Sequence, residues 1–374
     1  MNIYDREDWP KFRWDHERLN GPLAAVRYKQ GKLIGRMEAI GFSLRSQASL
    51  HTLTLDVLKS TAIEGEILKK EQVRSSIARR LGIDIGSLTP ASRNIEGVVE
   101  MVLDATQNYD KPLTKERLFS WHDSLFSTRY SGMRKKKVAD WCDETSRTIQ
   151  IVPGPIGWEH VHFEAPPADQ LDKEMTAFLD WFNSDDGTDL VLRACIAHLW
   201  FVTLHPFDDG NNRIARTIAD MTLARSEQST QRFYSISAQI RQERDVYYRS
   251  LEAAQKNSLD ITEHLEWFLD CLNHAFDSVE ETLSGVFKKV QFWESCVALP
   301  LNERQRLILN KLLDDFEGKL TSSKWAKLAK CSQFTALRDI QGLVESGILA
   351  KDPAGGRSTS YSLTEGVWAA TRME

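Results

Sequence analysis

Apolar residues recur every three or four positions along most of this chain, a period that predicts helices. The first helical stretch runs from about Trp14 to Met101, and only Gly21-Pro22 and Leu88-Thr89-Pro90 interrupt it. Thr114 is expected to cap a further helix, Arg117 to Phe126. Later helices are predicted at Asp169–Asn183, at Asp189–Leu204, after Gly210, at Gln239–Gln255 and at Ile261–Lys289. The predicted fold class is therefore mainly α.

One segment before the C-terminal region breaks this helical pattern. Between Val138 and Pro167 β-branched residues alternate with turn residues, and the run Thr148 to Val152 leads directly into the turn-forming sequence Pro153 to Trp158. Such a pattern predicts a β-hairpin on an otherwise helical body. It is the single β element predicted before the C-terminal region.

The C-terminal region reads as a separate domain. Leu299-Pro300-Leu301-Asn302 resembles a linker, and the elements predicted after it are helices at Glu303–Asp315, Ser322–Ala329 and Phe334–Ser346, a short strand, a turn at Asp352–Gly356 and a strand at Ser358–Ser362. That order is typical of a winged helix-turn-helix. Three domains are predicted: a helical domain at 1–108, a second domain at 109–290 and the winged helix at 300–374.

Charge and cysteine content limit the class of protein. The 374 residues include 48 Lys and Arg against 53 Asp and Glu, a net charge of -5, so no overall basic field favours nucleic acid or an anionic membrane. The five cysteines are widely spaced without a CxxC pair, which argues against a disulfide framework and a zinc site. The polar N-terminus and the lack of a long apolar run predict a cytoplasmic protein with no membrane contact.

The richest concentration of reactive residues lies in the twelve positions from His205 to Arg216, His-Pro-Phe-Asp-Asp-Gly-Asn-Asn-Arg-Ile-Ala-Arg. Pro206 ends one helix, and the turn Gly210-Asn211-Asn212 permits positive φ. Successive N–H groups can then point inward as an anion nest at the start of the next helix. Phosphate oxygens are the natural guest of such a nest.

The side chains around this turn suit a polyphosphate. Arg213 and Arg216 lie three positions apart on one helix face, where two planar guanidinium groups can clamp phosphates. Asp209 places a carboxylate beside them, which suits Mg²⁺. His205 is left to act as a base.

These twelve residues resemble the signature of the Fic family, His-x-Phe-x-(Asp or Glu)-Gly-Asn-x-Arg-x-x-Arg, with every defining position matched. The departure is Asn212, where the family usually has Gly or Lys. The resemblance implies a Fic-type helical core, ATP as substrate and Mg²⁺ as cofactor. The roles it implies are His205 as general base, Phe207 as core anchor, Asp209 as metal ligand, Gly210, Asn211 and Asn212 as phosphate cradle, and Arg213 and Arg216 as phosphate ligands.

A second motif, Ser-x-x-x-Glu-Gly at Ser60 to Gly65, resembles the inhibitory helix of one class of Fic proteins. The resemblance implies that Glu64, on a helix over the site, forms an ion pair with Arg216 and fills the space that the γ-phosphate needs. The alternative is that Glu64 is an ordinary solvent-exposed helix carboxylate beside Lys69 and Lys70. The resemblance therefore implies an enzyme that inhibits itself.

Two further segments occupy places that the resemblance assigns to substrate binding. The predicted hairpin corresponds to the family's flap, which pairs with the target segment, and Gly154 within it is expected to approach the nucleotide. Tyr247, Tyr248 and Gln255 resemble the stretch that lies against the adenosine. Ordinary core packing explains either segment about as well.

The function implied is a protein adenylyltransferase that moves AMP from ATP to a Ser, Thr or Tyr hydroxyl of another protein or of itself. The alternatives within the family are de-AMPylation and other Fic-type phosphotransfer. From another class, a winged-helix DNA-binding regulator with a vestigial Fic core stays open. The recognition helix offers Arg338 but also Asp339 and Glu345, so DNA contacts are thinly supported, and protein or homodimer contacts are as well supported.

Overall fold

The computed structural model describes residues 2–39, 42–126, 130–131, 134–135, 137–143, 150–152, 160–163, 165–256, 258–297, 299–313, 316, 318–353 and 359–364. The chain divides into two compact units, Met1–Gly82 with Thr89–Val279, and Ile83–Leu88 with Glu280–Glu374. The predicted domains at 1–108 and 109–290 thus fall largely within one unit. Their boundaries remain a prediction.

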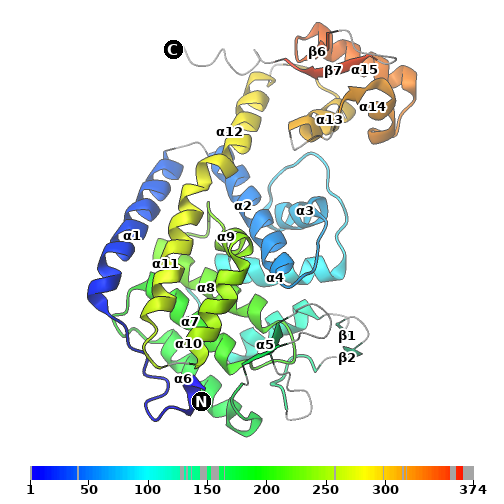
Figure 1. Cartoon of the computed structure of the whole chain (residues 1–374). Coiled ribbons are helices and arrows are strands. Elements are labelled where there is room, and N and C mark those ends of the chain that lie inside the picture. Colours follow the sequence, from blue (N-terminus) through cyan, green and yellow to red (C-terminus); the bar gives the residue numbers. More distant parts are fainter. Residues whose placement is uncertain are drawn as a thin grey trace. The chain divides into compact units, whose positions relative to one another are not determined.

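The first unit is built from helices, as predicted (Figure 1). They are α1 (His16–Glu38), α2 (Phe42–Ile63), α3 (Lys70–Leu81), α4 (Arg93–Gln107), α5 (Lys115–Leu125), α6 (Leu171–Asn183), α7 (Leu190–Leu204), α8 (Asn211–Glu227), α9 (Ile236–Gln242), α10 (Arg244–Lys256) and α11 (Thr262–Asp277), with short 3₁₀ turns at Ile3–Asp5 and Ala168–Gln170. The prediction of a mainly α fold is confirmed. Among the residues that the structure describes, no helix is long and apolar enough to cross a bilayer.

Helices α7 and α8 form the centre of this unit. The Asp189 side chain caps α7 by accepting the Val191 N–H at 2.8 Å. Because α7 is apolar on nearly all sides, it is buried along its length and packs against α8. Around this pair, α2, α4 and α5 each contact α8, and α11 contacts α7. The loop between the two central helices is thereby held on a rigid support.

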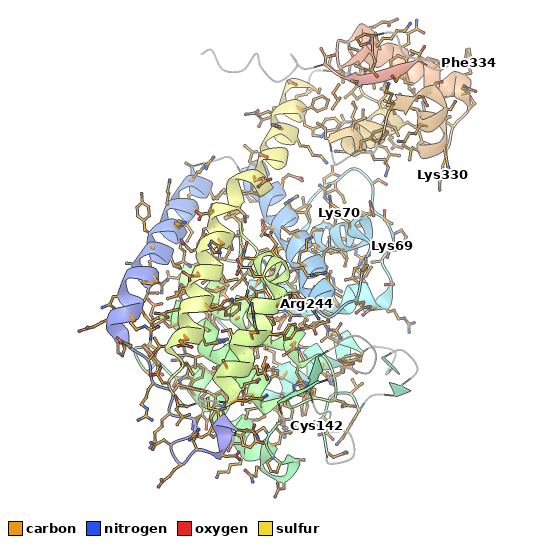
Figure 2. All side chains as sticks on the ribbon, in the orientation of Figure 1. Lys69, Lys70, Cys142, Arg244, Lys330 and Phe334 are labelled. Atoms are coloured by element: carbon orange, nitrogen blue, oxygen red, sulfur yellow. The ribbon has the colours of Figure 1, made fainter. Side chains whose placement is uncertain are left out.

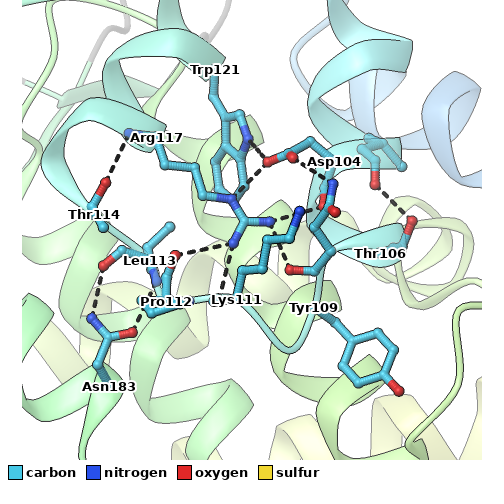
Figure 3. Close-up of polar contacts among 12 residues, drawn as sticks. Asp104, Thr106, Tyr109, Lys111, Pro112, Leu113, Thr114, Arg117, Trp121 and Asn183 are labelled. Atoms are coloured by element: carbon cyan, nitrogen blue, oxygen red, sulfur yellow. Dashed lines mark hydrogen bonds and ion pairs between the residues drawn. The ribbon is translucent and has the colours of Figure 1, made fainter.

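The corner between α4 and α5 is fixed by one arginine (Figure 3). Thr114 caps α5 as predicted, accepting the Arg117 N–H at 3.2 Å. The Arg117 guanidinium donates to the Asp104 carboxylate at 2.7 Å and to its carbonyl at 2.9 Å. It also donates to the carbonyls of Asn108, Lys111 and Pro112 at 3.0 to 3.2 Å. Arg117 therefore ties the end of α4 to the segment that leads into α5.

The predicted hairpin is present as strands β3 (Gln150–Val152) and β4 (His160–Phe163), which pair antiparallel with Ile151 opposite Val161. The turn that joins them lies outside the described residues. A second pair, β1 (Tyr130–Ser131) and β2 (Arg134–Lys135), is not predicted from the sequence. Strands of two residues are too short to produce an alternating pattern.

Several helix boundaries differ from the prediction; the helix predicted at Ile261–Lys289, for example, is divided at Ser278 into Thr262–Asp277 and Val279–Ser295. Helix α1 continues through Gly21-Pro22, although an interior proline removes one helical hydrogen bond, and it packs along α11. The helix predicted at Gln239–Gln255 is divided at Glu243, which ends α9. The Glu243 carboxylate accepts from His274 at 3.0 Å and from Gln239 at 2.5 Å. Tertiary contacts, and not Gly or Pro, accompany this break.

The second unit contains α12 (Val279–Ser295, which starts at the unit boundary), α13 (Glu303–Leu313), β5 (Leu320–Thr321), α14 (Ser322–Leu328), α15 (Gln333–Glu345), β6 (Leu349–Lys351) and β7 (Ser360–Leu363). The antiparallel sheet has the order β5-β7-β6. Trp325, Ile340 and Phe292 lie in its core. The predicted order of helices and strands is present, with β5 in addition. Its identification as a winged helix remains a prediction.

Candidate active site

His205 lies directly after α7 and takes a left-handed conformation with φ +46°. Its side chain is nearly buried, with 9% exposed. The Cys142 N–H donates to the Pro206 carbonyl at 2.8 Å, and the Cys142 thiol lies 3.7 Å from the His205 carbonyl. A non-glycine residue at positive φ is uncommon, and such strain often occurs at functional sites. The structure thus fixes the backbone that carries the imidazole.

Phe207 holds the loop in the core. It is fully buried, and its ring stacks on His122 with centroids 4.1 Å apart and lies 5.2 Å from Trp141. The Asn211 side chain closes the loop, accepting the Phe207 N–H at 2.9 Å and donating to the Phe207 carbonyl at 2.6 Å. The amide of Asn211 therefore serves the loop itself, so a phosphate contact from this residue would come from its backbone.

The turn at Gly210 opens α8. Gly210 has φ +79°, and a Cβ atom there would lie 3.0 Å from the Phe126 ring, so glycine is needed for both conformation and space. The first helical hydrogen bond of α8 runs from Ile214 N–H to the Gly210 carbonyl at 3.0 Å. The N–H groups of Asn211, Asn212 and Arg213 precede it and have no acceptor within the helix. The start of α8 can therefore bind an anion.

The two adjacent carboxylates have different partners. Asp208 accepts the Lys137 N–H at 3.2 Å, and Asp209 accepts the Gly210 N–H at 2.7 Å. Among the described residues, no group of three or more His, Cys, Asp or Glu side chains could hold a metal ion. A magnesium ion at Asp209 would therefore take most of its ligands from phosphates and water, which is usual for Mg²⁺.

Arg216 is buried, with 1% of its surface exposed, and faces the end of α2. Its guanidinium donates to the Ser60 hydroxyl at 2.9 Å, to the Ser60 carbonyl at 2.8 Å and to the Glu64 carboxylate at 2.8 Å. Burial works against its charged form, but the Glu64 carboxylate and the neighbouring tyrosines outweigh this and raise the pKa of Arg216. The ion pair that the sequence predicts is present.

The resemblance implies that Glu64 lies on a helix. In the structure it lies one residue beyond the end of α2. Its N–H donates to the Thr61 carbonyl at 3.1 Å, and Gly65 follows with φ +84°. The glycine gives the left-handed turn that ends many helices. Glu64 therefore stands at a helix end, with 27% of its side chain exposed.

Arg213 contacts a second carboxylate. Its guanidinium lies 3.4 Å from the Glu66 carboxylate and 5.4 Å from the centre of the Phe126 ring. The other Glu66 oxygen accepts from the Asn94 amide at 2.5 Å. Both arginines of the twelve-residue loop and helix start are thus engaged by the segment that follows α2.

The residues expected to contact the adenosine lie in two environments. Tyr247 is fully buried, and its hydroxyl shares a 3.1 Å hydrogen bond with His198. Burial raises the pKa of Tyr247 and of Tyr248, and it lowers the pKa of His198 well below its usual value. Gln255 is buried and donates to Thr203 of α7 at 3.3 Å. Tyr247 and Gln255 are therefore core residues beside the loop, and Tyr248 is partly exposed.

Some residues at this site escape sequence reasoning. Arg244 donates to the Ile63 carbonyl at 3.0 Å and lies 4.9 Å from the Tyr248 ring, and Cys142 contacts the His205-Pro206 backbone. Figure 2 labels both residues. The role of Glu66 could have been suspected from the sequence, because it is a carboxylate directly after the Glu64-Gly65 pair. The sequence gives no comparable indication for Arg244 or Cys142. Gly154, expected near the nucleotide, lies outside the described residues.

Comparison with known proteins finds similarity to two domain families. The Fic/DOC family matches residues 112–223, and a domain of unknown function (DUF4172) matches residues 2–83. The curated protein adenylyltransferase Fic of Nematostella vectensis is 34% identical over 116 residues, 30% of this chain and 25% of that protein. Protein adenylyltransferase fic-1 of Caenorhabditis elegans is 28% identical over 185 residues, 47% of this chain and 32% of that protein. The chain thus spans less than half the length of these relatives.

Solved structures show the same fold. A Fic family protein from Desulfovibrio desulfuricans G20 superposes with a TM-score of 0.52 at 21% identity, covering 92% of this chain and 96% of that one. A Fic domain containing signaling protein from Bacteroides thetaiotaomicron VPI-5482 gives a TM-score of 0.51 at 15% identity, covering 70% and 98%. The chain therefore contains a Fic/DOC domain at residues 112–223, and its fold is similar to those of solved Fic proteins.

Proposed function

We propose that this protein is an adenylyltransferase that moves AMP from ATP to a hydroxyl group of a protein and that Glu64 inhibits it. The observation that carries the proposal is the arrangement of the loop. An imidazole, the open N–H groups of α8 and two arginines surround one helix start, and a carboxylate from another segment is bound to one of those arginines. The adenylyltransferase names of the curated relatives support the same activity.

A triphosphate suits this arrangement. The N–H groups at the start of α8 would bind phosphate oxygens, and Arg213 and Arg216 would neutralise the outer phosphates. Asp209 would hold Mg²⁺, which supplies further neutralisation of the phosphate charge when bound. The Phe207 anchor keeps the loop rigid, so little reorganisation is needed when the nucleotide binds.

The transfer step needs one proton acceptor. The oxygen of a Ser, Thr or Tyr hydroxyl attacks the α-phosphorus of ATP and forms a new P–O bond, while the bond from the α-phosphorus to the bridging oxygen breaks and pyrophosphate leaves. His205 takes the hydroxyl proton. Arg213 and Arg216 stabilise the negative charge that develops on the departing pyrophosphate.

Inhibition follows from the ion pair between Glu64 and Arg216. A γ-phosphate that uses Arg216 has to displace the carboxylate, which is bonded to the guanidinium at 2.8 Å. With Glu64 in place, ATP would bind in a pose that does not align its α-phosphorus with an acceptor oxygen. A cytoplasmic location, a homodimer and self-modification remain predictions.

The DNA-binding alternative finds little support. The exposed face of α15 carries Phe334 and Leu337, which are 77% and 44% exposed, and Asp339 on the same helix is buried in an ion pair with Arg304 at 2.7 Å. A helix that reads DNA needs cationic side chains toward the phosphates. Arg338 is also exposed on this helix, but one cation beside Phe334 and Leu337 makes the helix better suited to apolar contacts.

Purified protein incubated with α-labelled ATP and Mg²⁺ tests the proposal. Glu64→Gly is expected to raise labelling of protein roughly tenfold to hundredfold, the worth of one hydrogen bond to a charged group. His205→Ala in the same background is expected to lower it by about 10²- to 10⁴-fold, because the base is lost. That double variant also controls for label that contaminating enzymes transfer, because they would be unaffected by the loss of His205.

Each outcome answers a separate part of the proposal. Absence of label from the Glu64→Gly protein and from added candidate targets would remove adenylyl transfer. Equal labelling by wild type and Glu64→Gly would remove inhibition alone. Undiminished labelling in the double variant would remove the role of His205.

A further inference from the structure

The segment after α2 carries two carboxylates, and each contacts a different arginine of α8. Glu64 accepts from Arg216 at 2.8 Å, and Glu66 lies 3.4 Å from Arg213. The two arginines are one turn apart on the same helix face. From this geometry we propose that Glu66 is a second inhibitory carboxylate, which competes with nucleotide phosphate for Arg213. The inference rests on the function proposed above.

The backbone holds the two carboxylates in this arrangement. The Thr61 carbonyl accepts both the Glu64 N–H at 3.1 Å and the Glu66 N–H at 3.3 Å, so Glu66 is tied to the helix end. Gly65 between them has φ +84°, a conformation that disfavours other residues. Because the turn fixes both residues to the end of α2, they face α8 together.

Asn94 positions the Glu66 side chain. Its amide nitrogen, near the start of α4, donates to one Glu66 oxygen at 2.5 Å, while the other oxygen faces Arg213. An amide holds a carboxylate without cancelling its charge, so the attraction to Arg213 is retained. The neutral Asn94 amide thus orients the Glu66 carboxylate, and the Arg213 guanidinium pairs with its charge.

The Glu66 contact is the weaker of the two. The Glu66 side chain is 43% exposed, against 27% for Glu64. The Glu66–Arg213 contact is 3.4 Å long, whereas the Glu64–Arg216 contact is 2.8 Å long. Exposed ion pairs contribute little and are screened by salt. Arg213 itself is nearly buried, and its Nε has no hydrogen-bond partner among the described residues. Its Nε can therefore donate to a phosphate directly, and a phosphate at its other nitrogens has only the weak Glu66 contact to displace.

Removing the charge of Glu66 should strengthen nucleotide binding. Glu66→Gln keeps an oxygen for the Asn94 amide, and it is expected to tighten ATP binding about two- to fivefold in the Glu64→Gly background, the range of an exposed ion pair. The gain should disappear at high salt, where the contact is already screened. Glu71→Gln, which neutralises another exposed carboxylate at the start of α3, is the matched control and should change nothing.

Titration calorimetry with ATP and Mg²⁺ on the full chain, at about 0.05 and 0.5 M salt, measures these effects. Asn94→Ala should also tighten binding when Glu66 is present and should add nothing to Glu66→Gln, because it acts through that residue. A structural role for Asn94 would give the same change in both backgrounds and would overturn its assignment.

The result also separates this inference from the proposed function. If Glu64→Gly binds ATP but Glu66→Gln binds it no better than Glu71→Gln does, the second carboxylate is not inhibitory, and the proposed function stands. If no variant binds ATP, the proposed function fails and the inference fails with it. A salt-sensitive gain for Glu66→Gln supports both.

Discussion

Two arginines of this protein donate to groups near the C-terminal ends of neighbouring helices and serve different purposes. Arg117 donates to four carbonyls around the end of α4 and to the Asp104 carboxylate, all within one corner of the chain. Arg216 donates to the Ser60 carbonyl near the end of α2 and to side chains of Ser60 and Glu64. The first arginine is saturated by backbone, and the second largely by side chains.

The difference shows what separates a structural arginine from one that can change partners. Backbone carbonyls cannot leave without unfolding the turn, so the contacts of Arg117 are lost only with the fold. Side chains can rotate away at small cost, so the side-chain partners of Arg216, Ser60 and Glu64, can be replaced by a ligand. Burial is similar, with 12% of the Arg117 side chain exposed and 1% of Arg216, and so it does not distinguish the two roles.

The largest expected effect comes from removing the exchangeable arginine. Arg216→Ala in the Glu64→Gly background should lower AMP transfer about 10²- to 10³-fold, because the charge on the departing phosphates loses a donor. The measurement is labelling from α-labelled ATP at saturating nucleotide. Arg216→Lys keeps the charge but not the planar group, and it should recover only part of the activity. Full activity of the alanine variant would place Arg216 with the structural arginines.

The structural arginine should affect stability instead. Arg117→Ala is expected to lower the free energy of unfolding by about 2 to 3 kcal/mol, since carbonyls and a partly exposed carboxylate lose a charged donor. Urea denaturation measures this value. Arg18→Ala, which removes an exposed pair with Glu266, should cost less than about 1 kcal/mol and serves as the comparison.

Transfer activity tells the two arginines apart. The folded fraction of Arg117→Ala should label protein as wild type does, because the hydrogen-bond partners described for Arg117 all lie between Asp104 and Thr114, outside the twelve-residue loop. A loss of transfer without a loss of stability would contradict the distinction.

The smallest effect should come from Ser60→Ala. The Ser60 hydroxyl accepts from Arg216 at 2.9 Å, and its loss should weaken the hold on the arginine by about 1 kcal/mol. Transfer by the otherwise wild-type enzyme should then rise severalfold, while Glu64→Gly with Ser60→Ala should exceed Glu64→Gly only slightly. A fall in transfer would mean that Ser60 supports catalysis and not inhibition.

Much of this site could be predicted because its residues are adjacent in sequence. The turn at Gly210 follows from a residue that permits positive φ, and the helix that delivers His205 follows from its apolar length. The pairing of Glu64 with Arg216 crosses 152 positions and was reached only through a resemblance. Periodicity alone contains no information about which distant helices meet.

The remainder depends on contacts that leave little trace in the local pattern. No Gly or Pro in the sequence predicts the helix break at Glu243. Strands β1 and β2 are too short to show an alternating pattern of apolar and polar residues. Pro22 predicts a break that packing against α11 prevents. Arg244 and Cys142 contact backbone carbonyls of the site. Every residue has a backbone carbonyl, so the sequence does not show which one such a residue will contact.

The position of Glu64, one residue past the end of α2, has a consequence for how completely the enzyme can be silenced. Its carboxylate can swing into water by side-chain rotation, on a timescale of picoseconds to nanoseconds at exposed positions, without unwinding the helix. If the contact is worth about 2 kcal/mol, a few per cent of molecules would have the arginine open at any moment. The inhibited enzyme would therefore keep a low rate of AMP transfer. Regulation would raise or lower this rate without switching the reaction off completely.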